Sequence, residues 1–342
     1  MNNLEPPFTS RSIGCSALSL SSNDGNHIFA RTFDYPSLGK SCVLFIPRSY
    51  EYKMLEHAPK ARTHTSMYAS IGMGVVGYSC PTLFDGVNEK GLCGGTLYFT
   101  GSAAYETNPQ AKQKINPAFS LTVILSSCAS VEEACAFFED NDLSNEELAV
   151  GKRLSLHFFF IDSAGETAII EPMQKGITLY RDGIGVLTNS PDYAWHLANL
   201  RNYTSVSSTP QKARKFLGKM IQPFGLGGGL ALPGDFSSPS RFVRLAFAKD
   251  ALPAAADERD GITKAFSALT SVTLSEGLVQ GENGEPEETL YTAAMCAETQ
   301  NYYISMHANR RLTVYNLPTE LEGKDLLQFP LPMTQDIAMG NF

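Results

Sequence analysis

Residues 15–35, CSALSLSSNDGNHIFARTFDY, form the most informative stretch of this 342-residue sequence. Small polar and apolar residues alternate over 15–22, which is the two-residue period of a strand with one buried face. The tetrad NDGN at 23–26 has the composition of a tight turn, and an apolar run, HIFARTF, follows it. The stretch is therefore predicted to form a β-hairpin that begins at Cys15.

Beyond the hairpin, blocks of strand pattern alternate with blocks of helix pattern. Strands are predicted at 41–47, 68–79, 92–99, 156–162, 167–172, 177–181, 184–189, 289–295, 301–307 and 311–316. Helices are predicted at 115–128, 131–141, 193–202, 210–221, 240–250 and 259–272. The blocks have no regular βαβ rhythm, which disfavours a doubly wound sheet. We therefore expect an α+β fold of stacked antiparallel sheets covered by helices, with residues 15–342 as a single domain.

The composition narrows the possible partners. Hydrophobic residues make up 43% of the chain and charged residues 18%, a balance that supports a large buried core. The net charge is −8 and the basic residues are not clustered, so neither nucleic acid nor an anionic membrane is an expected partner. The sequence has no apolar run long enough to predict a transmembrane helix. Residues 1–14, MNNLEPPFTSRSIG, lack the apolar core of a secretory signal.

The cysteines, histidines and glycines give no sign of a metal or phosphate site. The number of cysteines, seven, is odd and their spacing is irregular, so neither a disulfide framework nor a zinc site is expected. They are Cys15, Cys42, Cys80, Cys93, Cys128, Cys135 and Cys296. The six histidines show no H-x-x-x-H spacing, and the Gly-rich loop at 225–235 lacks the Lys-Ser/Thr of a phosphate loop. We therefore expect no metal, no cofactor and a reducing, cytoplasmic location.

Cys15 differs from the other cysteines because the hairpin gives it two candidate partners. Arg31 and Asp34 lie in the returning strand, which folds beside the first. A fixed guanidinium lowers the pKa of a thiol by favouring the thiolate, and a carboxylate can hold an amine that acts as a base. An Arg–Asp pair at this spacing is usually an ordinary surface salt bridge. The spacing by itself leaves both interpretations open.

Together with later motifs, this hairpin resembles the start of the choloylglycine hydrolase family, which comprises penicillin V acylases and conjugated bile salt hydrolases. The similarity continues in order through LFDGVNEKGLCGGTLYF (83–99), GVLTNSPDYAWHLANLRNY (185–203), LPGDFSSPSRFVRLAF (232–247) and YTAAMCAETQNYY (291–303). The resemblance implies the N-terminal-nucleophile hydrolase fold, a four-layer αββα sandwich of two antiparallel sheets. It also implies a homotetramer, formed partly through an extended segment that corresponds to residues 202–224.

The resemblance makes Cys15 the nucleophile, with its freed α-amino group as the general base. Arg31 and Asp34 match the pair that flanks this nucleophile. Residues 1–14 would then be a leader that is removed, because Cys15 has no free amine while it is bonded to Gly14. This leader is longer than an initiator methionine, so we expect Cys15 to cut the preceding peptide bond itself.

Three further positions match site residues of the family. Asn189, in VLTNSP, matches the side-chain donor of the oxyanion hole, and Tyr98, in TLYF, matches the position whose backbone N–H is the second donor. Arg241, in SPSRFVR, matches the last arginine of the catalytic site. Arg244, three residues further on, is expected to be structural.

The sequence says least about the substrate. By resemblance, Tyr98 and the motifs DGVNEKGL and NSPDYAWH are acylase-like, and a tyrosine ring can stack on a phenoxyacetyl group. Penicillin V is therefore the first predicted substrate, with conjugated bile salts and N-acyl homoserine lactones as alternatives. Phe33 and residues 71–78 are candidates for the acyl pocket, although packing in the core explains them equally well.

Overall fold

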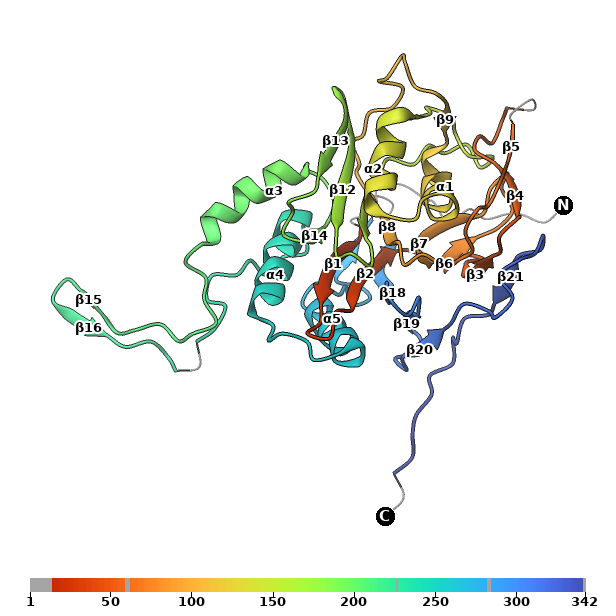
Figure 1. Ribbon diagram of the computed structural model, residues 1–342. Coiled ribbons are helices and arrows are strands. Elements are labelled where there is room, and N and C mark those ends of the chain that lie inside the picture. Colours follow the sequence, from red (N-terminus) through yellow and green to blue (C-terminus); the bar gives the residue numbers. More distant parts are fainter. Residues whose placement is uncertain (1–13, 59–61, 226, 282–283, 341–342) are drawn as a thin grey trace.

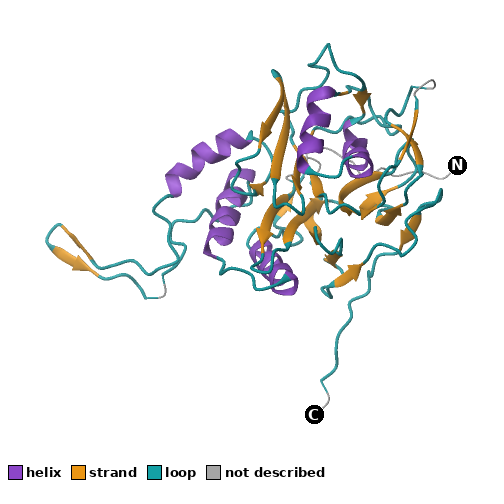
Figure 2. Ribbon diagram, in the orientation of Figure 1, coloured by secondary structure: helices purple, strands orange, loops and turns teal. Residues whose placement is uncertain are grey.

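The computed structural model describes residues 14–58, 62–225, 227–281 and 284–340. Two large antiparallel sheets dominate it, with helices on their outer sides (Figures 1 and 2). The helices are α1 (Ser120–Ser127), α2 (Val131–Asp140), α3 (Tyr193–Leu200), α4 (Ser238–Ala251) and α5 (Glu258–Thr270), with 3-10 turns η1 (Pro117–Phe119) and η2 (Arg201–Tyr203). In the part of the chain that is described, none of these helices is long and apolar enough to cross a bilayer.

The first sheet contains the predicted N-terminal hairpin at its centre. Its strand order is β14-β1-β2-β18-β19-β20, and β17 pairs with β18 off this path. The strands are β14 (Val186–Leu187), β1 (Ser16–Ser21), β2 (His27–Tyr35), β18 (Pro286–Cys296), β19 (Tyr302–Met306), β20 (Thr313–Tyr315) and β17 (Val279–Gln280). The chain thus places strands from both of its ends next to each other in one sheet.

The second sheet has the order β13-β12-β11-β8-β7-β6-β3-β21. Its strands are β13 (Gly176–Tyr180), β12 (Thr167–Met173), β11 (Leu156–Ile161), β8 (Cys93–Tyr98), β7 (Thr82–Asn88), β6 (Ser70–Val75), β3 (Cys42–Ile46) and β21 (Leu327–Phe329). Three short pairs among the described residues lie outside both sheets: β4 (Glu51–Lys53) with β5 (Thr63–Thr65), β9 (Lys114–Ile115) with β10 (Asp142–Leu143), and β15 (Arg214–Phe216) with β16 (Lys219–Ile221).

The layers follow from which elements pack together. Helices α1 and α2 pack on the second sheet, and α4 and α5 pack on the first. Between the sheets, β2 contacts β8 and β11, and Phe29 meets Phe159 edge to face with 5.4 Å between ring centroids. Both phenyl rings are fully buried. The predicted four-layer αββα sandwich is therefore confirmed.

The hairpin itself has the predicted geometry. Ala17 of β1 pairs with Arg31 of β2, and the N–H of Ser22 donates to the carbonyl of Asn26 at 2.9 Å across the turn. Gly25 adopts a φ of +91°, which the turn requires and which glycine reaches without steric cost. The alternating pattern and the turn residues were therefore sufficient to place Cys15 at the start of a buried strand.

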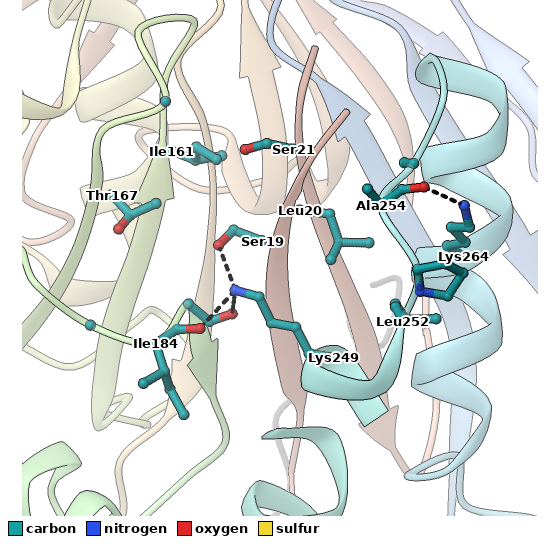
Figure 3. Close-up of a pocket in the computed structure, with 15 residues that line it drawn as sticks. Ser19, Leu20, Ser21, Ile161, Thr167, Ile184, Lys249, Leu252, Ala254 and Lys264 are labelled. Atoms are coloured by element: carbon teal, nitrogen blue, oxygen red, sulfur yellow. Dashed lines mark hydrogen bonds between the residues drawn. The ribbon is translucent and has the colours of Figure 1, made fainter. Parts of the chain in front are cut away.

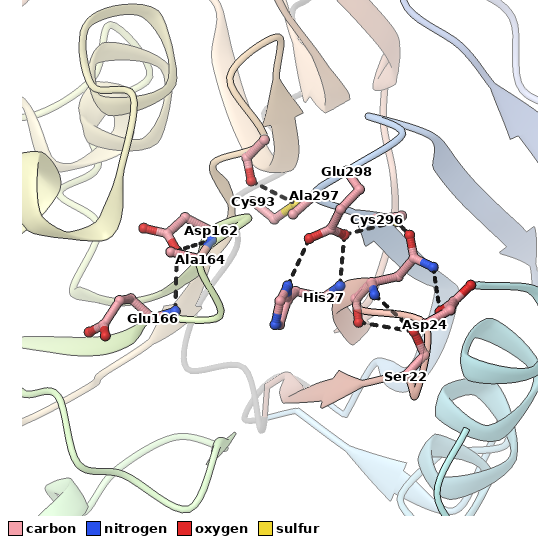
Figure 4. Close-up of polar contacts among 12 residues, drawn as sticks. Ser22, Asp24, His27, Cys93, Asp162, Ala164, Glu166, Cys296, Ala297 and Glu298 are labelled. Carbon is pink, nitrogen blue, oxygen red and sulfur yellow. Dashed lines mark hydrogen bonds and ion pairs between the residues drawn. The ribbon is translucent and has the colours of Figure 1, made fainter. Parts of the chain in front are cut away.

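The first residue of β2, His27, is hydrogen-bonded to the segment that follows β18. The carboxylate of Glu298 accepts the backbone N–H of His27 at 2.7 Å and lies 2.7 Å from its Nδ1 (Figure 4). The thiol of Cys296 also contacts this carboxylate, at 3.4 Å. These contacts join the N-terminal and C-terminal parts of the first sheet.

The prediction of a helix at 210–221 is wrong. This segment forms a two-stranded hairpin, β15 (Arg214–Phe216) with β16 (Lys219–Ile221), that projects from the sandwich (Figure 1). Leu217 and Gly218 form its turn with φ angles of 45° and 87°. A glycine at this position interrupts a helix and supplies the positive φ of a tight turn, so the apolar spacing around it was misleading.

Other boundaries also differ from the predictions. Only Val186–Leu187 of the strand predicted at 184–189 pairs with β1. The predicted helix at 115–128 starts later, because Asn116 caps the 3-10 turn that precedes α1. Strands β7 and β21 were not predicted, and β21 is only three residues long and pairs at the edge of the second sheet.

Candidate active site

Cys15 lies directly before β1, and only 3% of its surface is exposed. Its thiol shares a narrow cavity of about 20 Å³ with Phe33 of β2. Burial raises the pKa of the Cys15 thiol, and the charges of Arg31 and Arg241 and a backbone hydrogen bond from Asp34 oppose this only in part. A thiol in this environment needs a base to become a nucleophile.

Arg31 reaches from the first sheet to the second. Its Nη1 donates to the carbonyls of Phe84 and Thr96 at 2.9 and 2.8 Å, and its side chain is fully buried. Its Nη2 has no hydrogen-bond partner among the described residues. Arg31 therefore retains donor capacity and a positive charge close to the thiol.

Asp85, which the sequence analysis did not single out, supplies the counter-charge. Its Oδ2 lies 3.6 Å from Nη1 of Arg31, and burial raises the pKa of Asp85 while Arg31 lowers it. The hydroxyls of Tyr291 and Tyr302 donate to its two oxygens, each at 2.6 Å. Both oxygens accept hydrogen bonds from hydroxyl groups, and Oδ2 lies beside the guanidinium, so we assign Asp85 as ionised. Its position in the LFDGVNEKG motif was the available signal.

Asp34 is fully buried beside the nucleophile. The hydroxyl of Thr289, which was also not predicted, donates to its Oδ1 at 2.6 Å. Burial raises the pKa of Asp34 to about 6, against the opposing effects of Arg241, Thr289 and Arg31. The carboxyl group is therefore close to its titration point near neutral pH.

Arg241, on α4, links the nucleophile to Asn189. Its Nη1 donates to the carbonyl of Cys15 and to Oγ of Ser16, both at 2.7 Å, and its Nη2 donates to Oδ1 of Asn189 at 2.7 Å. Burial lowers the pKa of Arg241, and the charge of Asp34 opposes that shift. This arginine positions two of the other predicted residues.

Asn189 is held at every polar atom. Its backbone N–H donates to Oγ of Ser238 at 2.9 Å, and its carbonyl lies 2.8 Å from Nε2 of His196. Its Nδ2 donates to the carbonyl of Tyr98 at 2.9 Å. An amide nitrogen carries two protons, so one remains for another acceptor.

Tyr98 lines the same cavity as Cys15. Its backbone N–H stays our predicted oxyanion donor, and its carbonyl accepts a hydrogen bond from Nδ2 of Asn189. Its ring stacks on Tyr35 with 6.0 Å between centroids, and the two hydroxyls are 3.4 Å apart. The pair forms part of the wall near the cavity, which Tyr98 lines together with Leu83 and Leu156.

Gly14 precedes the nucleophile and contacts the same amide. It has a φ of +84°, and a Cβ placed on it would lie 2.4 Å from Nδ2 of Asn189. Residues 1–13, the rest of the predicted leader, lie outside the described residues. The peptide bond before Cys15 is therefore next to the predicted oxyanion donor.

Arg244 takes no part in this cluster. Its Nε donates to the carbonyl of Ser271 and its Nη1 to the carbonyls of Pro233 and Asp235, so it connects loops. The structure thus brings together Cys15, Arg31, Asp34, Tyr98, Asn189 and Arg241 and separates them from this neighbouring arginine.

A larger cavity, of about 360 Å³, lies towards the other end of β1 (Figure 3). There Lys249 of α4 donates to the carbonyls of Ile184 and Gly185 at 2.7 and 3.2 Å. Burial lowers the pKa of this lysine to about 8. Helix α4 therefore holds the segment that contains β14 at both ends, through Lys249 and Arg241.

Comparison with known proteins identifies the class. Residues 15–329 match the linear amide C-N hydrolases of the choloylglycine hydrolase family. The chain belongs to this family, and its fold is that of the N-terminal-nucleophile hydrolases. It is therefore a hydrolase of linear amides.

Individual relatives refine this result. The bile salt hydrolase/transferase of Clostridium perfringens is 29% identical over 327 residues, which cover 94% of this chain and 98% of that protein. The conjugated bile acid hydrolase of Lactobacillus gasseri is 33% identical over 322 residues, with 92% and 99% coverage. The penicillin V acylase of Pectobacterium atrosepticum is 31% identical over 187 residues, which cover 53% of this chain and 44% of that protein.

Solved structures agree with this. A mutant of the conjugated bile acid hydrolase from Clostridium perfringens superposes with a TM-score of 0.86 at 29% identity, covering 96% of this chain and all of that chain. The penicillin V acylase of Agrobacterium tumefaciens, at 21% identity and a TM-score of 0.72, shares the fold. The similarity therefore favours the bile salt alternative over penicillin V, which Tyr98 had placed first.

Proposed function

We propose that the chain, once cut before Cys15, hydrolyses conjugated bile salts through a thioester on Cys15. The convergence of Arg31, Asp34, Asn189 and Arg241 on this buried thiol carries the proposal. The choice of bile salts rests on relatives named for bile salt hydrolysis, which match more than nine-tenths of this chain.

The mechanism has two steps. The freed α-amine of Cys15 takes the thiol proton, and the sulfur adds to the amide carbonyl. Asn189 donates its remaining Nδ2 proton to the oxyanion, and one such donor contributes on the order of 10²–10³ in rate. The amine leaves with the proton, and water activated by the same α-amine hydrolyses the thioester. The backbone N–H of Tyr98 remains our predicted second donor.

The two charged neighbours have separate roles in this proposal. Arg31 favours the thiolate over the neutral thiol. Asp34 holds the α-ammonium group once it exists, and that cation favours the ionised carboxylate. In the uncut chain, burial raises the pKa of Asp34 to about 6, and an α-ammonium group beside it would lower that pKa.

Penicillin V is a second candidate because aromatic rings surround the cavity. Phe33 stacks on both Phe84 and Tyr291, with ring centroids 5.0 and 4.9 Å apart, and Tyr98 stacks on Tyr35. A flat phenoxy group suits such walls. A cavity of about 20 Å³ is far below the roughly 300–1,000 Å³ of ligand sites, so either substrate needs space that the uncut chain does not provide.

A direct comparison of substrates tests the proposal. The purified mature enzyme is assayed with glycocholate, taurocholate, penicillin V and a long-chain N-acyl homoserine lactone, and kcat/KM is compared. We expect the highest value for one of the two bile salts. A clear preference for penicillin V or for the lactone would refute the choice of bile salts and leave the amide chemistry intact.

We also propose that the chain assembles as a homotetramer through residues 202–224. The hairpin β15–β16 exposes apolar side chains that are unusual on a solvated surface. These are Phe216, Leu217, Met220, Ile221 and Phe224, all at least half exposed. Size-exclusion chromatography with light scattering measures the assembly directly.

A further inference from the structure

Gly14 lies on the acyl side of the bond that the proposed self-cleavage breaks. Its φ of +84° is in the left-handed region that residues with side chains rarely adopt. A Cβ here would lie 2.4 Å from Nδ2 of Asn189 and 2.8 Å from its Cγ and Oδ1. Non-bonded heavy atoms normally stay about 3.5 Å apart or more, so only a bare α-carbon fits against this amide.

Asn189 cannot turn away without losing its own contacts. Its Oδ1 accepts from Arg241 at 2.7 Å, and its Nδ2 donates to the carbonyl of Tyr98 at 2.9 Å. Its backbone is fixed on both sides, by Ser238 and by His196. The amide plane that faces the leader is therefore a rigid wall, unlike the end of a flexible side chain.

We propose that Asn189 excludes from Cys15 any acyl group whose α-carbon carries a substituent in the position of an L-Cβ, in the leader and in the substrate alike. This rests on the proposed function for the substrate and on the predicted self-cleavage for the leader, both of which form a thioester on the same sulfur. In maturation, Sγ of Cys15 bonds to the carbonyl carbon of Gly14, the C–N bond breaks, and the thiol proton passes to the released nitrogen. Water then hydrolyses the thioester, which leaves a carboxylate on Gly14 and restores the thiol.

The same wall defines a class of substrate. The acyl group of a substrate takes the place that the leader has left, with its α-carbon where that of Gly14 lay. A CH₂ group there has two hydrogens, as glycine does, whereas a methyl group in the position of the L-Cβ would collide with Asn189. Substrates of the type R–CH₂–CO–NH–R′ therefore fit, and those with two α-methyl groups do not. Conjugated bile salts and penicillin V both belong to the type that fits, so the restriction operates within each candidate substrate.

The first arm of the test follows leader removal in purified precursor by intact mass. Gly14→Ala is compared with Ile13→Ala, which changes the adjacent leader residue. We expect the control to be cut like the wild type and Gly14→Ala to be cut on the order of 10²-fold more slowly, the cost of about 1 Å of misplacement. Cutting of Gly14→Ala at the wild-type rate overturns the inference for the leader.

The second arm does not depend on self-cleavage. A chain in which the initiator methionine directly precedes Cys15 supplies the mature enzyme. We compare kcat/KM for whichever of glycocholate and penicillin V it hydrolyses with the α,α-dimethyl homologue of that substrate, which must place one methyl towards Asn189. In the wild-type enzyme we expect kcat/KM to be on the order of 10²-fold lower for the dimethyl homologue than for the substrate. In Asn189→Ala we expect the two values of kcat/KM to be much closer to each other.

The two arms separate the possible failures. If the wild-type enzyme has the same kcat/KM for the substrate and for its α,α-dimethyl homologue, the inference for substrates is overturned. Inactivity on every amide refutes the proposed function, while the first arm still decides whether position 14 must be glycine. A wild-type precursor that stays uncut refutes self-cleavage, while the second arm still measures the restriction on substrates.

Discussion

Removing the carboxylate of Asp85 should cause a large loss of stability. Asp85 and Arg31 are both fully buried, with 3.6 Å between Oδ2 and Nη1. Asp85→Asn keeps the shape of the side chain and leaves the guanidinium without its counter-charge. Loss of one partner from a buried ion pair costs about 3–5 kcal/mol, because the other charge remains desolvated.

This free energy converts to a shift in Tm. Unfolding entropy is about 2.1 cal/mol/K per residue, so the free energy of unfolding of this 342-residue chain changes by about 0.7 kcal/mol per degree near its midpoint. The expected decrease for Asp85→Asn is therefore about 4–7 °C. Tyr302→Phe is the matched control, because it removes one hydroxyl donor from the same carboxylate and keeps the charge. Its cost of about 1.5–3 kcal/mol predicts a decrease of about 2–4 °C.

Scanning calorimetry measures both variants. Each is made in a Cys15→Ala background, so that differences in leader removal cannot affect the comparison. If Asp85→Asn melts no lower than Tyr302→Phe, the charge of Asp85 contributes nothing beyond a hydrogen-bond acceptor. The assignment of an ionised Asp85 would then be wrong.

Three other predictions concern Asp34, Cys15 and the projecting hairpin. The pKa of Asp34 is raised by burial to about 6, above its ordinary 3.8, so the folded precursor retains a proton that the unfolded chain releases between these values. Its stability should therefore fall by up to about 3 kcal/mol as the pH rises from about 4 to 6, and Asp34→Asn should abolish this slope in urea titrations. Cys15→Ala should keep residues 1–14 attached by intact mass, and trimming of this variant to residue 15 would reveal a separate protease. Leu217→Asp should reduce the tetramer to smaller species in light scattering without lowering the Tm, and an unchanged mass would contradict assembly through this hairpin.

The local pattern was a good guide to the N-terminal hairpin, although both faces of β2 and of the first part of β1 are buried. The hairpin of β1 and β2 was predicted because alternation and turn residues act over a few positions. This was enough to place Arg31 and Asp34 near Cys15. The resemblance, rather than the pattern, supplied Asn189 and Arg241, which come from segments far along the chain.

Contacts between distant segments could not be predicted in this way. Asp85 meets Arg31 only because two sheets stack face to face, and no spacing in the sequence expresses that arrangement. Thr289 reaches Asp34 through the pairing of β18 with β2, which joins opposite ends of the chain. The helix expected at 210–221 failed for a different reason, since its exposed apolar residues do not pack on the body of the same chain.

The hydrogen bonds from Arg241 to the carbonyl of Cys15 and to Oγ of Ser16 would hold the new N-terminus in place after a cut before Cys15. Both anchors lie downstream of the bond to Gly14, and the pairing of β1 with β2 holds the next residues. The new terminus is therefore already docked when the leader departs. In the proposed maturation, activation would then need no folding step and no rearrangement of the new N-terminus, only the departure of the leader.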